Sequence, residues 1–270
     1  MLLLLRGVGS ALGIIAYYLG IRREITLLNI AHAFPGMTKH QQRATVRRSY
    51  SNLGKVFFEF IYLRYGRKEK VHNGLKIVNL QEIDKLISGP KGSILLSGHL
   101  GNWEWLALGC GLQVERPLDV IIKNQRSSFA ERFLARMRGR FGNRTIDAGN
   151  VREIYRALSN RELLAILGDQ AAPAESIRVP FFGREVPTFE GTARLALRTR
   201  ASILFLQPYR RSTQGYDCRF HVIDYSDLVE ASESNVRELT ARHTALLEEC
   251  IREKPELWLW QHRRWKNAEA

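Results

Sequence analysis

The sequence predicts an α/β protein in which helices flank a mixed, largely parallel central sheet and amphipathic helices precede it. Three observations lead to this fold class. From Gly74 onward, short apolar runs alternate with stretches of helical periodicity, as in strand–helix–strand units. Before that point, apolar residues recur at helical spacing with cations between them. A chain of 270 residues is also long enough to bury a sizeable core as a single unit.

The first 70 residues are predicted to form helices that associate with a membrane. Residues 1–20 are mostly apolar, are interrupted by Arg6 and glycines, and are followed by Arg22 and Arg23. This stretch only borders on the length of a spanning helix, so we expect it to lie in or dip into the bilayer interface. Packing against the protein's own core is the alternative.

A second amphipathic helix is expected at residues 41–65, where apolar and basic positions alternate at helical spacing. Such a stripe usually faces a core, but two basic amphipathic helices also suit a platform that faces a membrane. We therefore predict membrane-associating helices over residues 1–70 and a single compact α/β domain over residues 71–270.

Apolar runs and helical periodicity predict the elements of the α/β domain. Strands are expected at residues 76–78, 93–97, 118–122, 163–167, 203–206 and 220–223. Helices are expected at residues 83–87, 103–110, 128–138, 150–158, 191–199 and 235–253. Lys254-Pro255 ends the last helix, because the residue before a proline leaves the helical region. In open α/β sheets, ligands bind at the carboxyl ends of strands, so side chains at those ends are the functional candidates.

His99 and Glu104 lie five positions apart, directly behind the apolar run 93–97. If Gly101-Asn102 opens a helix, His99 lies in the strand-to-helix turn, and Glu104 lies in the first turn, close enough to orient the imidazole. An imidazole held in this way is a general base that can take a proton from an attacking hydroxyl as an acyl group arrives. Surface hydrogen bonding or helix capping is the alternative for both residues.

Asp169 and Gln170 follow the apolar run 163–167 at the same kind of strand end as His99. The two strand ends could converge on one crevice. We expect Asp169 and Gln170 to order the catalytic loop or to contact the acceptor. A turn aspartate that bonds its own backbone is the alternative.

The formal net charge of +14 predicts an acidic partner, with a generally solvated basic surface as the alternative. One segment is rich in cations: Lys123, Arg126, Arg132, Arg136, Arg138, Arg140, Arg144, Arg152 and Arg156. Nothing in it resembles a zinc finger, a helix-turn-helix or an RNA-binding sheet motif, so we expect no nucleic acid partner. The three cysteines suggest no disulfide framework, and the seven histidines form no His-x3-His pair. We expect no metal, no cofactor and a reducing compartment.

Five sequence blocks resemble, in the same order, those of the late acyltransferases of lipid A biosynthesis, the lauroyl and myristoyl transferase family. Residues 97–104 look like the family's His-x4-acid block, with Leu100 where many members carry Phe. The other blocks are residues 29–35, residues 168–170, residues 179–183 with Thr188 and Gly191 after them, and residues 258–266. The resemblance covers nearly the whole chain and places it in the lysophospholipid acyltransferase-like superfamily.

The resemblance implies a glycerolphosphate acyltransferase-like fold and acyl transfer to a hydroxyl of an anionic glycolipid, a lipid A precursor. It implies acyl carrier protein, or acyl-CoA, as the donor, and an anionic inner membrane with the catalytic domain facing the cytoplasm. His99 would deprotonate the hydroxyl and Glu104 would hold the ring. Backbone amides around Gly101-Asn102, or a nearby arginine, would stabilise the oxyanion. The implied substrate-binding residues are Asn102, Arg138, Arg140, Asp169, Gln170 and Thr188.

Arg138 and Arg140 lie in residues 136–142, where the family carries an arginine-bearing block. An arginine fork matches phosphate oxygens, and a solvated charge at a helix end is the alternative for each. Thr188 is expected to cap the helix at residues 191–199. Phe181 and Phe182 could line an acyl channel or pack in the core.

The C-terminal segment 258–266 is rich in tryptophans and cations. We expect its tryptophans to pack against the sheet and its cations, among them Arg263, Arg264 and Lys266, to face the membrane interface.

Three other functions are alternatives to this one. The same chemistry could act on a phosphatidylinositol mannoside or a lysophospholipid, and a non-catalytic protein could use the same cations to bind an anionic membrane. A serine esterase is disfavoured because no Gly-x-Ser-x-Gly motif occurs, and Ser97 is the only hydroxyl near His99.

Overall fold

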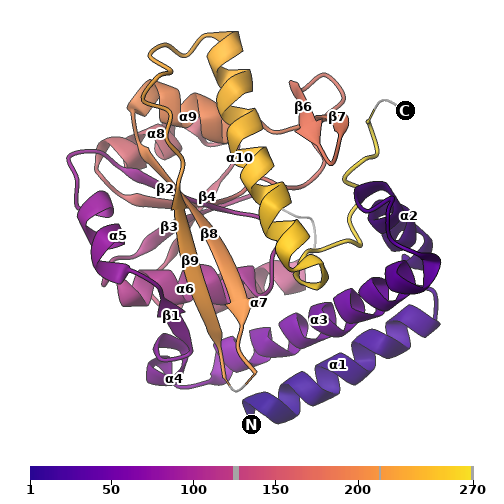
Figure 1. Ribbon diagram of the computed structural model, residues 1–270. Helices are drawn as coiled ribbons and strands as arrows, with labels where there is room; N and C mark the ends of the chain where they lie inside the picture. Colours follow the sequence, from indigo (N-terminus) through magenta and orange to yellow (C-terminus); the bar gives the residue numbers. More distant parts are fainter. Residues whose placement is uncertain (124–127, 213, 269–270) are drawn as a thin grey trace.

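A seven-stranded sheet lies at the centre of the described residues (Figure 1), in the order β1-β9-β8-β2-β5-β3-β4. The structure is a computed structural model that describes residues 1–123, 128–212 and 214–268, so Arg126 lies outside it. Strands β8, β2, β5, β3 and β4 run parallel, β9 is antiparallel to β8, and β1 is parallel to β9. The predicted mixed, largely parallel sheet is therefore confirmed.

The strands are β1 (Leu75–Ile77), β2 (Ser93–Ser97), β3 (Leu118–Ile122), β4 (Arg144–Asp147), β5 (Leu163–Leu167), β8 (Ser202–Arg210) and β9 (Tyr216–Val222). β2, β3 and β5 have the bounds that their apolar runs predict. β8 and β9 continue beyond their predicted ends because they pair as an antiparallel hairpin out to Arg210 and Tyr216, where partly buried polar residues join the ladder. The sequence predicts no strand at β4, an edge strand with only one buried residue, Ile146.

A separate hairpin, β6 (Arg178–Phe181) with β7 (Arg184–Pro187), was also missed. Its short strands contain Pro180 and Pro187, which argue against a strand in the sequence.

Two hydrophobic cores lie on the two faces of the sheet. Successive residues of β2 alternate between them: Ile94 and Leu96 belong to one core and Leu95 to the other. Burial on both faces explains why the strands read as continuous apolar runs. One face packs against α8 (Val151–Ser159), α9 (Gly191–Thr199) and α10 (Glu233–Glu253), and the other against α5 (Leu80–Ile87), α6 (Trp103–Gln113) and α7 (Ser128–Gly139). As predicted, α10 ends at the residue before Lys254-Pro255, and the 3-10 helix η1 (Pro255–Leu257) follows.

The N-terminal region contains α1 (Leu2–Tyr18), α2 (Arg23–Ala33), α3 (Lys39–Tyr65) and α4 (Lys68–His72). Thr38 and Gln41 form a capping box that starts α3. α1 lies along α3 (Figure 1), and a Cβ built on Gly54 would come within 1.9 Å of the Gly9 carbonyl oxygen. These glycines therefore set the separation of the two helices.

The outer side of α1 is apolar and exposed, with Leu4 71%, Val8 43%, Leu12 48% and Ile15 50% accessible. Within the described part of the chain, no single helix is both long and apolar enough to cross a membrane. α1 and α2 together reach the required length and composition, but they bend by 93° where they meet. Membrane association and the boundary at residue 70 stay predictions.

Candidate active site

His99 and Asp169 meet at one edge of the sheet. Each follows the end of a strand, and Ser97 of β2 pairs with Leu167 of β5 in parallel register. Asp169 Oδ1 lies 2.6 Å from His99 Nδ1, and Asp169 Oδ2 accepts the His99 backbone N–H at 2.7 Å. The indole N–H of Trp258 donates to the same Oδ2 at 2.8 Å. The structure thus brings together the two strand-end residues that the sequence singled out.

Gly98 allows this close contact. A Cβ at position 98 would lie 3.0 Å from Asp169 Oδ2 and 2.7 Å from Leu247 Cδ1. A side chain here would therefore push the carboxylate away from the turn that carries His99.

The pair has strongly perturbed ionisation. Burial raises the pKa of Asp169, but the charge of His99 and the hydrogen bonds from His99 and Trp258 outweigh it and lower the pKa to about 2. Burial lowers the pKa of His99. The charge and the hydrogen bond of Asp169, together with the charge of Glu104, outweigh burial and raise the pKa above 6.5. An ionised carboxylate only accepts hydrogen bonds, so Nδ1 carries the proton and Nε2 presents the lone pair. Gln170 Nε2 lies 3.3 Å from that atom.

The imidazole is oriented by Asp169 rather than by Glu104, which corrects the expected geometry. Glu104 lies in the first turn of α6 as predicted and is 4% exposed. Its carboxylate is held by the guanidinium of Arg138 on α7, with Nε donating to Oε2 at 2.9 Å and Nη2 to Oε1. Glu104 therefore acts on His99 through its charge, while the ring's Nδ1 is bound to Asp169.

Asn102 holds the start of α6 in place. Its Oδ1 accepts the Trp105 backbone N–H at 2.8 Å, and its Nδ2 donates to Glu59 Oε2 at 2.9 Å. The side chain is fully buried. The neighbouring amide of Gly101 donates to the Leu257 carbonyl at 2.9 Å, so this amide is not available for the oxyanion role expected of it.

Arg140 lies at the end of α3, where its Nη1 donates to the carbonyls of Leu63 and Arg64 at 3.0 and 3.1 Å and its Nη2 to that of Gly66. These carbonyls lack helical partners, which explains the contact. Arg140 thus fits a structural role better than the phosphate contact expected of it.

Thr188 does not cap α9, whose N-cap residue is Glu190. The Thr188 hydroxyl is buried, donates to the Val186 carbonyl and accepts from Arg264 Nη2 at 2.7 Å. Arg264 is 1% exposed, so it does not face an interface as expected, whereas Arg263 and Lys266 are exposed. The buried guanidinium instead binds the Thr188 hydroxyl and the Pro187 carbonyl.

The aromatic residues near the C-terminus form part of the core. Trp258, Trp260 and Trp265 are buried, as expected, and Phe181 stacks on Trp265 at a centroid distance of 5.4 Å. Phe181 and Phe182 therefore belong to the core packing. Ser97, the hydroxyl nearest to His99 in the sequence, donates to the Leu206 carbonyl at 2.8 Å.

Glu59 of α3 is a further residue near the site that the sequence did not predict. This carboxylate is fully buried and accepts hydrogen bonds from Arg6 Nε (2.6 Å), Arg210 Nη1 (2.9 Å), the Tyr216 hydroxyl (2.7 Å) and Asn102 Nδ2 (2.9 Å). It thus joins α1, α3, β8, β9 and the turn after β2. A usable signal was present, because Glu59 falls on the same helical face as the buried Val56 and Leu63.

Residues 3–267 match the family described as bacterial lipid A biosynthesis acyltransferase. The chain is 23% identical over 267 residues to the lipid A biosynthesis lauroyltransferase of Escherichia coli (strain K12), covering 96% of this chain and 84% of that protein. It is also 23% identical over 261 residues to the lipid A biosynthesis palmitoleoyltransferase of Escherichia coli and to the lipid A biosynthesis acyltransferase of Shigella flexneri, covering 96% of this chain and 83% of each. Because the family match includes both strands that carry the site and nearly all of the chain, the protein belongs to the bacterial lipid A biosynthesis acyltransferase family.

Proposed function

We propose that this protein transfers a fatty acyl chain from an acyl thioester to a hydroxyl of a lipid A precursor, with His99 as the general base. One observation supports this most directly: the contact between His99 Nδ1 and buried Asp169 leaves Nε2 as the basic atom. Membership of the acyltransferase family supports the reaction class.

In the proposed reaction, His99 Nε2 takes the proton of the acceptor hydroxyl as its oxygen attacks the thioester carbonyl carbon. The new C–O bond gives a tetrahedral intermediate, and its collapse breaks the C–S bond. The leaving thiolate takes the proton back from the imidazolium, which restores neutral His99. No acyl-enzyme is required because the thioester is already activated, and Asp169 stabilises the imidazolium in between.

The start of α6 supplies positive potential to the intermediate. Trp103 begins this helix, and its ring lies 4.8 Å from the His99 ring between centroids. The partial positive charge of a helix N-terminus favours an oxyanion placed there. Arg138 binds Glu104 through Nε and Nη2, and we propose its Nη1 as a contact for an anionic group of the substrate.

Charge and exposure support the proposed donor, acceptor and location. A chain of net charge +14 suits an acidic acyl carrier protein, with acyl-CoA as the alternative donor, and it suits an anionic glycolipid acceptor. The exposed apolar residues of α1 suit attachment to the cytoplasmic face of the inner membrane.

Mass spectrometry tests the proposal directly. Purified protein is incubated with acyl carrier protein thioester and a lipid A precursor, and the acceptor should gain the mass of one acyl chain. His99→Ala should abolish this gain, whereas His40→Ala, at an exposed position on α3, should keep it. The absence of any gain with the wild-type protein and either thioester would favour a non-catalytic lipid-binding protein. Lipids from cells that lack the protein would then identify the acceptor and the acyl group together.

A further inference from the structure

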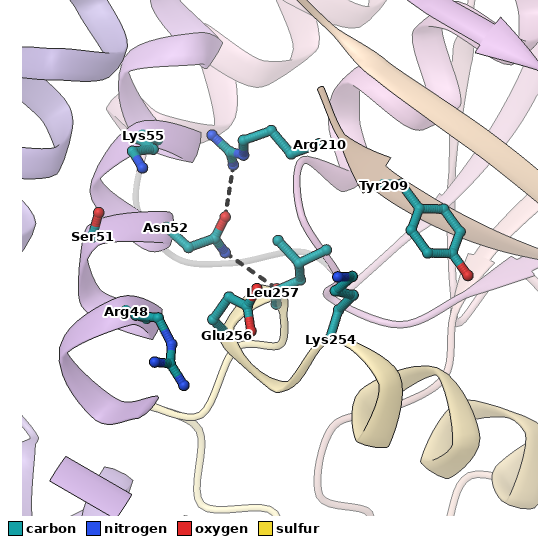
Figure 2. A pocket seen from close by; sticks show the side chains of 9 residues that line it. All are labelled: Arg48, Ser51, Asn52, Lys55, Tyr209, Arg210, Lys254, Glu256 and Leu257. Atoms are coloured by element: carbon teal, nitrogen blue, oxygen red, sulfur yellow. Dashed lines mark hydrogen bonds between the residues drawn. The ribbon is translucent and has the colours of Figure 1, made fainter. Parts of the chain in front are cut away.

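A cavity of about 340 Å³ lies between α3, the end of β8 and the segment that follows α10 (Figure 2). Four cationic side chains line it: Arg48 and Lys55 from α3, Arg210 from β8, and Lys254. Among the described residues that line the cavity, Glu256 is the single acidic one. The lining therefore carries a net positive charge, which favours an anionic ligand.

Little of this charge is neutralised by the protein. Arg210 pairs with Glu59 at 2.9 Å, but within the described part of the chain Arg48, Lys55 and Lys254 form no ion pair within 4.0 Å. Burial lowers the pKa of Lys55, the charges of Arg210 and Arg6 lower it further, and the charge of Glu59 opposes them only in part. A bound anion would relieve this repulsion.

Arg210 also has a donor to spare. Its Nη1 donates to Glu59. Its Nη2 donates to Asn52 Oδ1 at 2.7 Å, the hydrogen bond drawn in Figure 2. Its Nε is buried and lacks a hydrogen-bond partner among the residues that the structure describes. A buried guanidinium nitrogen without an acceptor carries a free-energy cost that a ligand oxygen or a water would remove.

The cavity adjoins α1, whose outer side is apolar. Ser51, which lines the cavity, has its hydroxyl oxygen 2.6 Å from that of Ser10 on α1. Leu4 and Leu12 of the same helix are exposed. An exposed apolar side on a helix that adjoins clustered cations matches the two parts of an anionic lipid, its acyl chains and its headgroup.

We propose that this basic cavity binds the phosphate of a membrane lipid headgroup, at a site separate from His99. His99, Glu104, Asp169 and Gln170 do not line the cavity. Headgroup binding is independent of acyl transfer, so this inference does not rest on the function proposed above.

Soluble dihexanoyl phosphatidic acid is the probe, titrated calorimetrically into the full-length protein in a nonionic detergent. Lys55→Gln and Lys254→Gln should each weaken binding about tenfold, as expected for the loss of one charge-assisted hydrogen bond. Arg47→Gln is the matched control, because Arg47 is exposed on α3 beside Arg48 but does not line the cavity. It should change affinity by no more than about twofold. His99→Ala should bind the probe normally, even if it transfers no acyl chain.

Several outcomes would overturn the proposal. An equal loss in Arg47→Gln would show general attraction to the basic surface. Equal binding of dihexanoylglycerol, which lacks the phosphate, would show that the acyl chains alone bind. Inorganic phosphate binding as tightly as the lipid would indicate a free anion rather than a headgroup. If either glutamine variant unfolds, the methionine variant at the same position replaces it, and unchanged affinity in that variant at a normal melting temperature would equally refute the site.

Discussion

The carboxylate of Asp169 binds His99 at two points, the ring Nδ1 at 2.6 Å and the backbone N–H at 2.7 Å. The first contact sets the tautomer and the second sets the turn that carries the ring. Trp258 donates to the carboxylate as well, at 2.8 Å, so both oxygens are engaged by rigid parts of the fold. Because adjacent strands carry the pair, its geometry depends on the sheet rather than on a loose loop.

Asp169→Asn should lower kcat by about 10²- to 10⁴-fold with a smaller change in KM, because an amide neither stabilises an imidazolium nor holds the tautomer. Release of thiol from the acyl thioester measures the rate. Asp224→Asn, at an exposed position, is the control and should leave the rate unchanged. A normally folded Asp169→Asn protein with wild-type kcat would remove Asp169 from the mechanism.

The pH dependence of kcat/KM should follow His99. Only the neutral ring accepts a proton, and Asp169 and Glu104 bring its pKa above 6.5, so activity should rise with pH through that raised value. Glu104→Gln removes one negative charge and should move this rise to lower pH. Control measurements with His40→Ala should match the wild-type profile. A profile that Glu104→Gln leaves unmoved would contradict the electrostatic role of Glu104.

The Glu104–Arg138 pair should stabilise the fold as a unit. Its side chains are 5% and 11% exposed, and loss of one partner from such a pair costs about 3–5 kcal/mol because the other charge stays buried. In urea unfolding, the double variant Glu104→Gln/Arg138→Gln should lose less free energy of unfolding than the sum of the losses in the two single variants. The same cycle on Glu248 and Arg252, a more exposed pair on α10, should show a coupling of only about 0.5 kcal/mol. If the two single losses in the free energy of unfolding add up to the loss in the double variant, the buried pair is not coupled.

Glu59→Ala should destabilise the protein by about 3–5 kcal/mol, because it leaves the buried guanidinium groups of Arg6 and Arg210 without this carboxylate. Thermal or urea unfolding measures this. Glu24→Ala removes an exposed carboxylate from α2 and should stay within about 0.5 kcal/mol of wild type. Equal stabilities of the two variants would show that Glu59 is not the centre of the network.

Membrane attachment through α1 should depend on its exposed apolar side. Leu12→Ser combined with Ile15→Ser should weaken binding to anionic vesicles by about tenfold or more, since each buried side chain contributes about 1.5 kcal/mol or more. Vesicle co-sedimentation measures this. Val222→Ser combined with Val229→Ser removes two exposed apolar side chains elsewhere, 57% and 75% accessible, and should have little effect. Similar losses in both double variants would exclude α1 as the specific contact.

The local elements around the site could be predicted because their signals are local. Short, mainly apolar runs mark β2, β3 and β5, which lie inside the sheet, and Lys254-Pro255 marks the end of α10. His99 and Asp169 could be identified for the same reason, since each directly follows such a run. Edge strand β4 and the hairpin β6–β7 lack this signal, because they are partly exposed or contain prolines.

Only the tertiary structure determined which carboxylate contacts the ring of His99. The sequence predicts Glu104, which is far nearer along the chain, as the acid that holds the ring, and predicts for Asp169 a role in ordering the catalytic loop or contacting the acceptor. The sheet places β5 directly beside β2 although β3 and β4 come between them in sequence, and strand order of this kind depends on long-range packing. Arg138 of α7 binds the Glu104 carboxylate. The sequence by itself thus determined which reactive side chains lie at each strand end. The packing of distant segments determined which of these side chains contact each other, because the contacts join residues 34 to 70 positions apart.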